Sequence, residues 1–323
     1  MQDAADTRDD DPRATDQRPD DPQSADQESN DQQSGGSNAP LIRNISDTAL
    51  WVAFYRALES ERADALFKDP FARRLAGERG EMIVRGMPKG AQFSWTMVTR
   101  TVVFDEIIMR AVNREGADTV INLAAGLDAR PYRLPLPPTL RWIEVDLPGI
   151  LDYKQERLAG ERAACEHEVV RLDLSNVEAR RELFARVGAS SERALVVCEG
   201  LLIYLTPEAV GALAQDLHAQ PSFRWWFIDI VRPEILKRME SSWGRRVAEA
   251  NAPFRFAPEE GTEFFRPYGW REREFRPMME EAHRIRREMP GAWLWRFLAR
   301  INPPSRREKF RRMGGSVLLE RED

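Results

Sequence analysis

The sequence predicts an α/β fold in which a mostly parallel sheet is covered by helices on both faces. Three features of the 323 residues support this prediction. A helical pattern fills the chain before Asp118, five short runs rich in β-branched residues then alternate with helical segments, and two more strand candidates follow. Alternating strands and helices are typical of a doubly wound parallel sheet, and a late pair of strands suggests an antiparallel, hairpin-like edge.

The first 40 residues differ in composition from the rest. They carry ten Asp and one Glu against three Arg, a formal charge of −8, whereas the remaining residues carry +3. They hold almost no large apolar side chains, so they cannot bury enough surface to offset their ordering entropy. We expect a disordered acidic tail over 1–40 and a folded domain over 41–323. Such a charge distribution argues against a nucleic-acid partner.

Residues 41–117 are expected to form N-terminal helices. Apolar side chains recur at three-to-four spacing from Ser46 to about Asn113. Asp69-Pro70 would open a short helix, Phe71–Leu75, and a long amphipathic helix is predicted from about Phe93 to Val112.

Residues 118–232 are expected to form the α/β core. Its five predicted strands are Thr119–Leu123, Arg141–Val145, Glu168–Leu172, Leu195–Cys198 and Arg224–Val231. The predicted helices between them are Ile150–Ala159, Val177–Val187 and Pro207–Ala219, the last capped by Thr206.

Residues 233–323 are expected to form a lid insertion and the last strands. A helix is predicted over Pro233–Ala250, with strands over Arg271–Phe275 and Ser316–Glu320. Large side chains of this region would either line an acceptor pocket or only pack the lid together: Trp243, Phe254, Phe264, Trp293 and Trp295.

Some classes of function receive no support from motifs. Cys165 and Cys198 lack metal-like spacing, and the three His form neither a zinc motif nor a hydrolase triad. The start of the chain does not resemble a secretory signal, and no apolar run is long enough to span a membrane. We expect a cytoplasmic protein with no bound metal and no membrane partner.

Ligands of open α/β sheets bind where strands end at their carboxyl edge. The first predicted strand runs into a small-residue turn at Gly126, which would let a ligand approach the backbone or would be an ordinary turn. Asp146 ends the second strand about 20 residues later, where a ribose hydroxyl pair is usually held. It could instead cap the following helix.

Candidate site residues also follow the third, fourth and fifth predicted strands. Asp173 and Leu174 follow the third strand and could frame an adenine, although Asp173 could also cap the next helix. Glu199 is a charged residue inside an apolar run, so it is either a site residue or a carboxylate that caps nearby backbone N–H groups. Tyr204, five residues later, is either a site residue or part of the core. Asp229 closes the fifth strand and has a purely structural alternative.

Three motifs in register resemble the leucine carboxyl methyltransferase family, which includes bacterial polyketide O-methyltransferases. They are Asn122–Leu134, Glu144–Pro148 with Lys154, and Glu199–Leu205, and the resemblance extends over about 44–323. Ala124 stands where the family usually has glycine. The resemblance implies a Rossmann-like class I methyltransferase fold with S-adenosylmethionine as cofactor.

The resemblance also implies roles by position. Arg100 would hold the methionine carboxylate, Gly126 would allow close approach, and Asp146 would bind the ribose hydroxyls. Asp173 and Leu174 would frame the adenine, Glu199 would face the methionine end, and Thr48 would contribute from the first helix.

The implied reaction is methyl transfer to a carboxylate or hydroxyl of a small, aromatic or polyketide-like acceptor. A carboxylate is already ionised at neutral pH and needs no base, whereas a hydroxyl would call on Glu199, Tyr204 or Asp229. One alternative is an NAD(P)-linked oxidoreductase, which the broken GxGxxG pattern disfavours. Another is a non-catalytic cofactor-binding protein on the same fold. The oligomeric state is left open.

Overall fold

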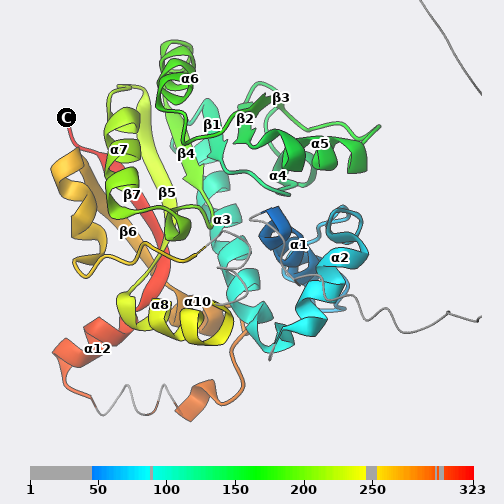
Figure 1. The fold of residues 1–323 in the computed structure, drawn as a ribbon, viewed down its shortest axis with the longest axis vertical. Helices are drawn as coiled ribbons and strands as arrows, with labels where there is room; N and C mark the ends of the chain where they lie inside the picture. Colours follow the sequence, from blue (N-terminus) through cyan, green and yellow to red (C-terminus); the bar gives the residue numbers. More distant parts are fainter. Residues whose placement is uncertain (1–45, 88–89, 245–252, 295–296, 298–301) are drawn as a thin grey trace, which may run out of the picture. The chain divides into compact units, whose positions relative to one another are not determined.

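Seven strands form one mixed sheet in the computed structural model, which describes residues 46–87, 90–244, 253–294, 297 and 302–323 (Figure 1). Their order is β3-β2-β1-β4-β5-β7-β6. The strands are β1 Thr119–Leu123, β2 Arg141–Asp146, β3 Glu166–Arg171, β4 Ala194–Cys198, β5 Phe223–Val231, β6 Trp270–Pro277 and β7 Gly314–Arg321. The acidic tail predicted over 1–40 lies outside the described residues.

The first five strands are parallel, and each of the five lies where the sequence predicts it. β1 sits between β2 and β4, so the strand order reverses beside it. In doubly wound sheets such a reversal opens a crevice at the carboxyl ends of the strands, and ligands bind there. The topology therefore fixes where a site is expected.

The predicted antiparallel edge is confirmed. β7 pairs antiparallel with both β5 and β6, so β6 runs in the direction of β5. Val231 lies opposite Gly314, and Pro277 lies opposite Gly315. The ends of β5 and β6 and the start of β7 therefore meet at one rim of the sheet, although residues 278–313 connect β6 to β7 in place of a tight hairpin.

Helices cover both faces of the sheet. α6 and α7 bury leucines and Phe184 against one face, whereas α3 packs Phe104, Ile107 and Ile108 against the other. The larger helices are α1 Ser46–Ser60, α2 Ala72–Gly86, α3 Ser94–Arg114, α5 Pro148–Arg157, α6 Val177–Ala189 and α7 Pro207–His218. The shorter ones are α4 Arg130–Arg133, α8 Pro233–Met239, α10 Met278–Arg284 and α12 Pro304–Arg311.

The helix predicted over Pro233–Ala250 is shorter in the structure. α8 ends at Met239, and a π-helical turn, Glu240–Gly244, follows it. Pro233 begins the helix as expected for a proline in the first turn. Residues 245–252 lie outside the described part, so the rest of that prediction is not tested.

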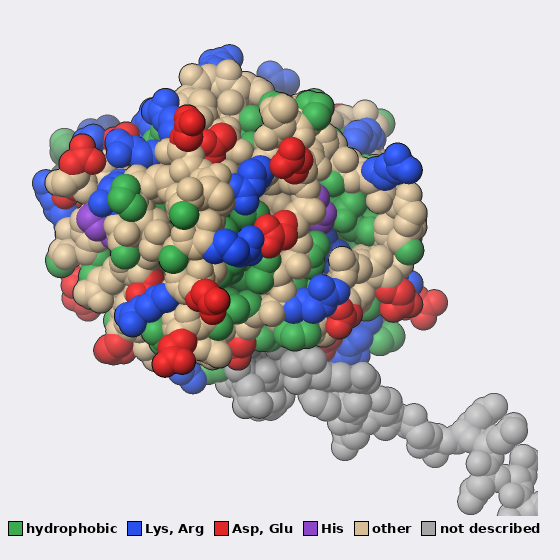
Figure 2. Space-filling view, turned by 90° about the horizontal axis from the view of Figure 1, so that it is seen from above, with side chains coloured by type: hydrophobic (Ala, Val, Ile, Leu, Met, Phe, Trp, Pro, Cys, Tyr) green, Lys and Arg blue, Asp and Glu red, His purple; other side chains and the backbone are tan. Residues whose placement is uncertain are grey.

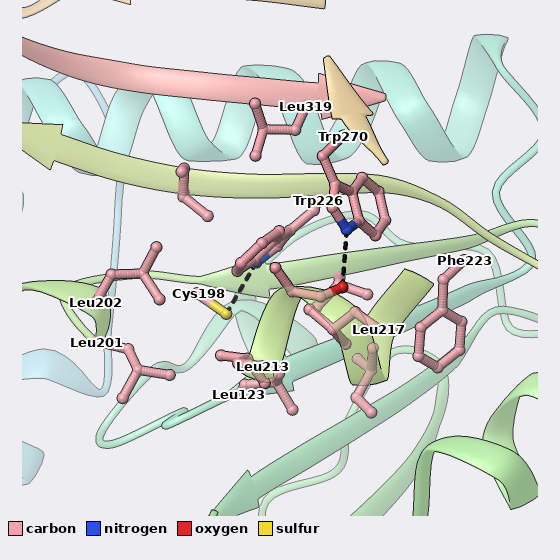
Figure 3. Close-up of a cluster of buried hydrophobic side chains, with 14 of the residues drawn as sticks. Leu123, Cys198, Leu201, Leu202, Leu213, Leu217, Phe223, Trp226, Trp270 and Leu319 are labelled. Carbon is pink, nitrogen blue, oxygen red and sulfur yellow. Dashed lines mark hydrogen bonds between the residues drawn. The ribbon is translucent and has the colours of Figure 1, made fainter. Parts of the chain in front are cut away.

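The core between the sheet and α7 is apolar and closely packed (Figure 3). Its two indoles find hydrogen-bond partners there: Trp270 donates to the Ala214 carbonyl at 3.0 Å, and Trp226 donates to Cys198 Sγ at 3.2 Å. Both Cys165 and Cys198 are free thiols. Burial raises the pKa of the Cys198 thiol to about 12, because the thiolate would be desolvated, so this cysteine is a core residue.

Charged side chains of both signs are interspersed on the face shown in Figure 2. Elsewhere in the described chain, charged side chains often form local pairs, such as Arg171 with Asp152 at 2.7 Å and Arg186 with Glu168 at 2.6 Å. Exposed pairs of this kind contribute little to stability. In the described part of the chain, no helix has the length and apolar character needed to cross a membrane.

Candidate active site

A cavity of about 860 Å³ opens at the carboxyl edge of the sheet, beside the reversal of strand order. Every residue that the sequence placed in a site contributes to its lining: Thr48, Arg100, Gly126, Asp146, Asp173, Leu174, Glu199, Tyr204 and Asp229. They come from α1, α3 and the ends of five strands. The structure therefore brings together side chains that are up to 181 positions apart in the sequence (Thr48 to Asp229).

The turn after β1 runs close to the first helix. Gly126 has a φ of 49°, and a Cβ there would lie 3.2 Å from Cβ of Ala49. Ala124 also has a positive φ, 55°. That conformation favours glycine and costs an alanine about 1–2 kcal/mol, which explains why glycine is the usual residue at this position in the family's pattern.

Asp146 holds this turn in place from the end of β2. Its Oδ2 accepts the Gly126 N–H at 2.7 Å, and its Oδ1 accepts the N–H of Leu147 at 2.7 Å. Burial raises the pKa of this carboxyl, and the two backbone N–H groups oppose the rise. A carboxylate beside a close backbone turn at the strand-order reversal is the arrangement that receives a ribose diol in doubly wound sheets.

Asp173 and Leu174 follow β3 at the outer part of the cavity lining. Asp173 is exposed, and its Oδ1 accepts the Ser175 N–H at 2.8 Å. The next helix is capped by Asn176 and not by Asp173, since Asn176 Oδ1 accepts the Ala179 N–H. Asp173 therefore shapes the turn before α6 and lines the cavity from there.

Arg100, Glu199 and Asp229 form an ionic cluster deeper in the cavity. Arg100 Nε lies 3.0 Å from Glu199 Oε1, and its Nη1 lies 3.3 Å from Asp229 Oδ2. Asp229 Oδ1 also accepts the Gly200 N–H at 2.6 Å. Gly200 has a φ of 71°, and a Cβ there would lie 3.2 Å from Arg100 Nη1, so glycine leaves room for the guanidinium.

Arg130 is the main residue that the sequence reasoning missed. It is 2% exposed, and its guanidinium lies 2.7 Å from Asp105, 2.8 Å from Asp128 and 2.7 Å from Glu199. It therefore joins α3, the β1 turn and the end of β4. Arg130 stands within the first matching motif, but no local pattern reveals which carboxylates it will meet.

These cations keep the buried acids ionised. Burial alone would raise the pKa of Glu199, but Arg130 and Arg100 outweigh it and lower that pKa below its usual range. Burial acts on Asp128 in the same direction, and Arg130 with Lys154 brings its pKa well below normal. Both carboxylates are therefore negatively charged, and weakly basic, at neutral pH.

Tyr204 lies between the first helix and the lid region. Burial raises the pKa of its phenol. A hydrogen bond between this phenol and the Thr48 side chain acts in the opposite direction and lowers the pKa, but burial is the larger effect. Its ring packs against Phe254 with centroids 5.7 Å apart. A phenol with a raised pKa stays protonated at neutral pH, so it is a poor proton acceptor.

Of the two uses that the sequence left open for the large side chains of residues 233–323, the structure shows both. Phe254 is buried and lines the cavity. Phe264 packs instead against Phe256 and Phe265, and Trp293 is 67% exposed; neither contributes to the cavity lining. The side chains of Trp243 and Trp295 lie outside the described part of the structure.

Comparison with known sequences is consistent with this geometry. The family model for leucine carboxyl methyltransferase matches residues 49–218, just over half of the chain. A candidate S-adenosyl-L-methionine-dependent methyltransferase of Streptomyces coelicolor is 36% identical over 189 residues, which span 54% of this chain and 64% of that protein. A second such protein, from Mycobacterium bovis, is 35% identical over 201 residues, which span 57% of this chain and 65% of that protein. The matched segment thus spans less than two thirds of these relatives.

Two solved structures share the fold at low sequence identity. A DUF574 family protein from Streptomyces avermitilis has a TM-score of 0.55 at 14% identity, covering 85% of this chain and 97% of its own. A candidate methyltransferase from Thermobifida fusca has a TM-score of 0.53 at 14% identity, with 88% and 96% covered. The fold is that of class I methyltransferases, with a mixed seven-stranded sheet and N-terminal helices. By its sequence, this chain belongs to the leucine carboxyl methyltransferase family.

Proposed function

We propose that this protein is an S-adenosylmethionine-dependent O-methyltransferase acting on a small acceptor with an apolar body. The observation that carries the proposal is the contact between Asp146 and the Gly126 N–H, at 2.7 Å, beside the reversal of strand order. This contact supports the proposal because a carboxylate beside a close backbone turn is where doubly wound sheets receive the ribose of a nucleoside. The relatives named above are described as using this cofactor.

The residues of the cavity fit the cofactor as follows. Asp146 would accept from the ribose hydroxyls, Leu174 and Asp173 would border the adenine, and Gly126 would leave space for the ribose. Arg100 would hold the methionine carboxylate, with Glu199 and Thr48 near the methionine end. When bound, the cofactor supplies an electrophilic methyl group on a sulfonium, and the protein supplies position and exclusion of water.

The acid and phenol groups of the cavity favour a carboxylate acceptor over a hydroxyl. A hydroxyl acceptor needs a group that takes its proton, and the three candidates are all engaged. Glu199 has a lowered pKa beside two arginines, Tyr204 has a raised one, and Asp229 accepts from Gly200 and Arg100. A carboxylate acceptor attacks the methyl group without losing a proton, so methyl transfer to it needs no base from these three residues.

Methyl transfer with an isotopically labelled cofactor tests the proposal. Carboxylic acids and phenols of matched size would be offered to the full chain, and labelled products would then be exposed to alkali. We expect alkali-labile label, the signature of a methyl ester, from the acids. Alkali-stable label from phenols alone would show that the acceptor is a hydroxyl, and a base would then have to be found.

An oxidoreductase remains the competing proposal for a doubly wound sheet. Its pyrophosphate-binding turn uses a stricter glycine pattern than the one at Ala124 to Ala129. Tight binding of NAD(P)H without binding of S-adenosylmethionine would favour it. Cofactor binding without transfer to any acid or phenol would favour a non-catalytic binding protein.

A further inference from the structure

The cavity has a second end, away from the ribose-binding carboxylate. It lies at the rim where β5 and β6 end and β7 begins, because Val231 is opposite Gly314 and Pro277 is opposite Gly315. α8 and α10 start directly after those two strands, so they border the same rim (Figure 1). Residues of both helices contribute to the cavity lining.

Methionines dominate this end. Six of the ten methionines of the chain line the cavity, and each of them is partly buried. They come from α3, α8, α10, the segment after α10 and the residue before β7. We call them the methionine wall: Met97, Met239, Met278, Met279, Met289 and Met313.

The wall offers few polar partners to a bound molecule. Two arginines also border the cavity at this end: Arg238 of α8 is exposed to solvent, and the Arg311 guanidinium pairs with Glu280 at 2.9 Å and with Glu308 at 3.5 Å. The hydroxyl side chains of Ser241 and Ser242 lie on the exposed π-helical turn. None of the three histidines contributes to the lining as far as the structure describes it. A polar acceptor body would therefore lose hydrogen bonds to water without replacing them.

Methionine is unbranched and polarizable, so a wall of methionines adapts to the shape of what it contacts. An aliphatic chain, which changes conformation freely, matches such a surface. A flat ring is held best between aromatic faces. Aromatic side chains also line the cavity, and one of them, Phe310, lies close in sequence to Met313 of the wall: Trp51, Phe93, Trp95, Tyr204, Phe254 and Phe310. The wall itself is made of methionines, so it favours a flexible aliphatic body at its own end of the cavity.

We propose that the methionine wall binds the flexible apolar chain of a carboxylic acid, whose carboxylate then lies toward the methyl donor. This inference rests on the proposed function for the reacting end and adds the class of acceptor. It makes Met278 and Met279, the first two residues of α10, specificity-determining residues for chain length. They have no part in the proposed cofactor contacts.

Calorimetry on the full chain saturated with S-adenosylhomocysteine tests the wall directly. The probes are straight-chain alkanoates from hexanoate to undecanoate, with naphthalene-carboxylate as a rigid acid of the same carbon number as undecanoate. Burying each methylene against the wall should tighten binding about fourfold, until the chain fills the cavity. Naphthalene-carboxylate should bind no tighter than undecanoate.

A double variant, Met278→Gln with Met279→Gln, keeps the side-chain length but adds polar amides. We expect undecanoate to bind about tenfold or more weakly to it, with the affinity for S-adenosylhomocysteine unchanged. Met82→Gln is the matched control, because Met82 is 54% exposed on α2 and does not line the cavity. Its alkanoate affinities should equal those of the wild type.

Three results would overturn the inference while S-adenosylhomocysteine still binds. They are affinities that do not depend on chain length, naphthalene-carboxylate binding tenfold tighter than undecanoate, or a double variant that binds undecanoate as the wild type does. Failure of the wild type to bind S-adenosylhomocysteine is a separate result, measured first, and it would overturn the proposed function itself.

Discussion

The two ends of the cavity are built from opposite kinds of chemistry. At one end, Arg100, Arg130 and their carboxylate partners lie at 2.7–3.3 Å from one another, with Arg130 buried and the others partly buried. At the other end, the methionine wall offers thioethers that adjust to their contacts. The difference teaches that one cavity can combine an end fixed by ion pairs with an end that adapts to its contacts, and we propose that the first receives the cofactor and the second the acceptor.

The ionic frame depends most strongly on Arg130. Arg130→Met should lower the free energy of unfolding by about 3–5 kcal/mol, because it removes the buried cation that Asp105, Asp128 and Glu199 share. Asp105 keeps its pair with Arg133 and Glu199 keeps its pair with Arg100, whereas the ion pair of Asp128 is lost. Chemical denaturation at pH 7 measures it. Arg171→Met is the control, since Arg171 forms an exposed pair with Asp152. A loss below about 1 kcal/mol for Arg130→Met would mean that the frame is not locked.

Asp146 is the residue that we propose binds the ribose of the cofactor. Asp146→Ala should weaken binding of S-adenosylmethionine about hundredfold, because two charged hydrogen bonds to the ribose are lost. Titration calorimetry gives the dissociation constant. Asp152→Ala is the control: Asp152 is on α5, its side chain is 60% exposed, and it does not line the cavity. A wild-type constant for Asp146→Ala would remove Asp146 from the ribose role.

Lowering the pH should reduce the contribution of the ionic frame to the free energy of unfolding. The pKa values of Asp128 and Glu199 are lowered in the folded state, so their stabilisation is complete above the unfolded pKa values, about 4, and is lost as pH falls below them. Unfolding free energies between about pH 6 and pH 3 should therefore decline more steeply in the wild type than in Arg130→Met. Parallel curves for the two proteins would contradict this assignment.

The smallest expected effect lies in the turn after β1. Ala124→Gly removes the cost of a positive φ at an alanine but makes the unfolded chain more flexible, so the net gain should be about 0.5–1 kcal/mol. Thermal or chemical unfolding would measure it. Destabilisation by the same amount would show that Ala124 is not strained in the folded protein.

Much of the fold follows from the sequence because strands and helices alternate with clear periodicity. Each predicted strand is present, and Asp146 and Glu199 could be placed because strand ends follow directly from strand positions. Two features of the cavity could not be predicted from the positions of strands and helices. Arg130 meets Asp105 and Glu199 only through packing of α3 and β4, and the methionine wall gathers side chains from Met97 to Met313 that share no local pattern.

The large side chains of residues 233–323 show why composition alone left two uses open, lining a pocket or packing the lid. Aromatic side chains are frequent there, but Phe264 fills the core beside Phe256 and Phe265. Large apolar side chains serve a core as readily as a pocket, and only the fold decides between these uses. The predicted tail over 1–40 and most of the roles assigned to single residues stay predictions.

The most direct test of the account is a calorimetric comparison of S-adenosylmethionine with NADPH on the wild-type chain. We predict saturable binding of S-adenosylmethionine at one site per chain and no comparable binding of NADPH. Binding of NADPH alone would contradict the assignment of Asp146 and Gly126 to the methyl donor, and with it the central claim that this cavity serves methyl transfer.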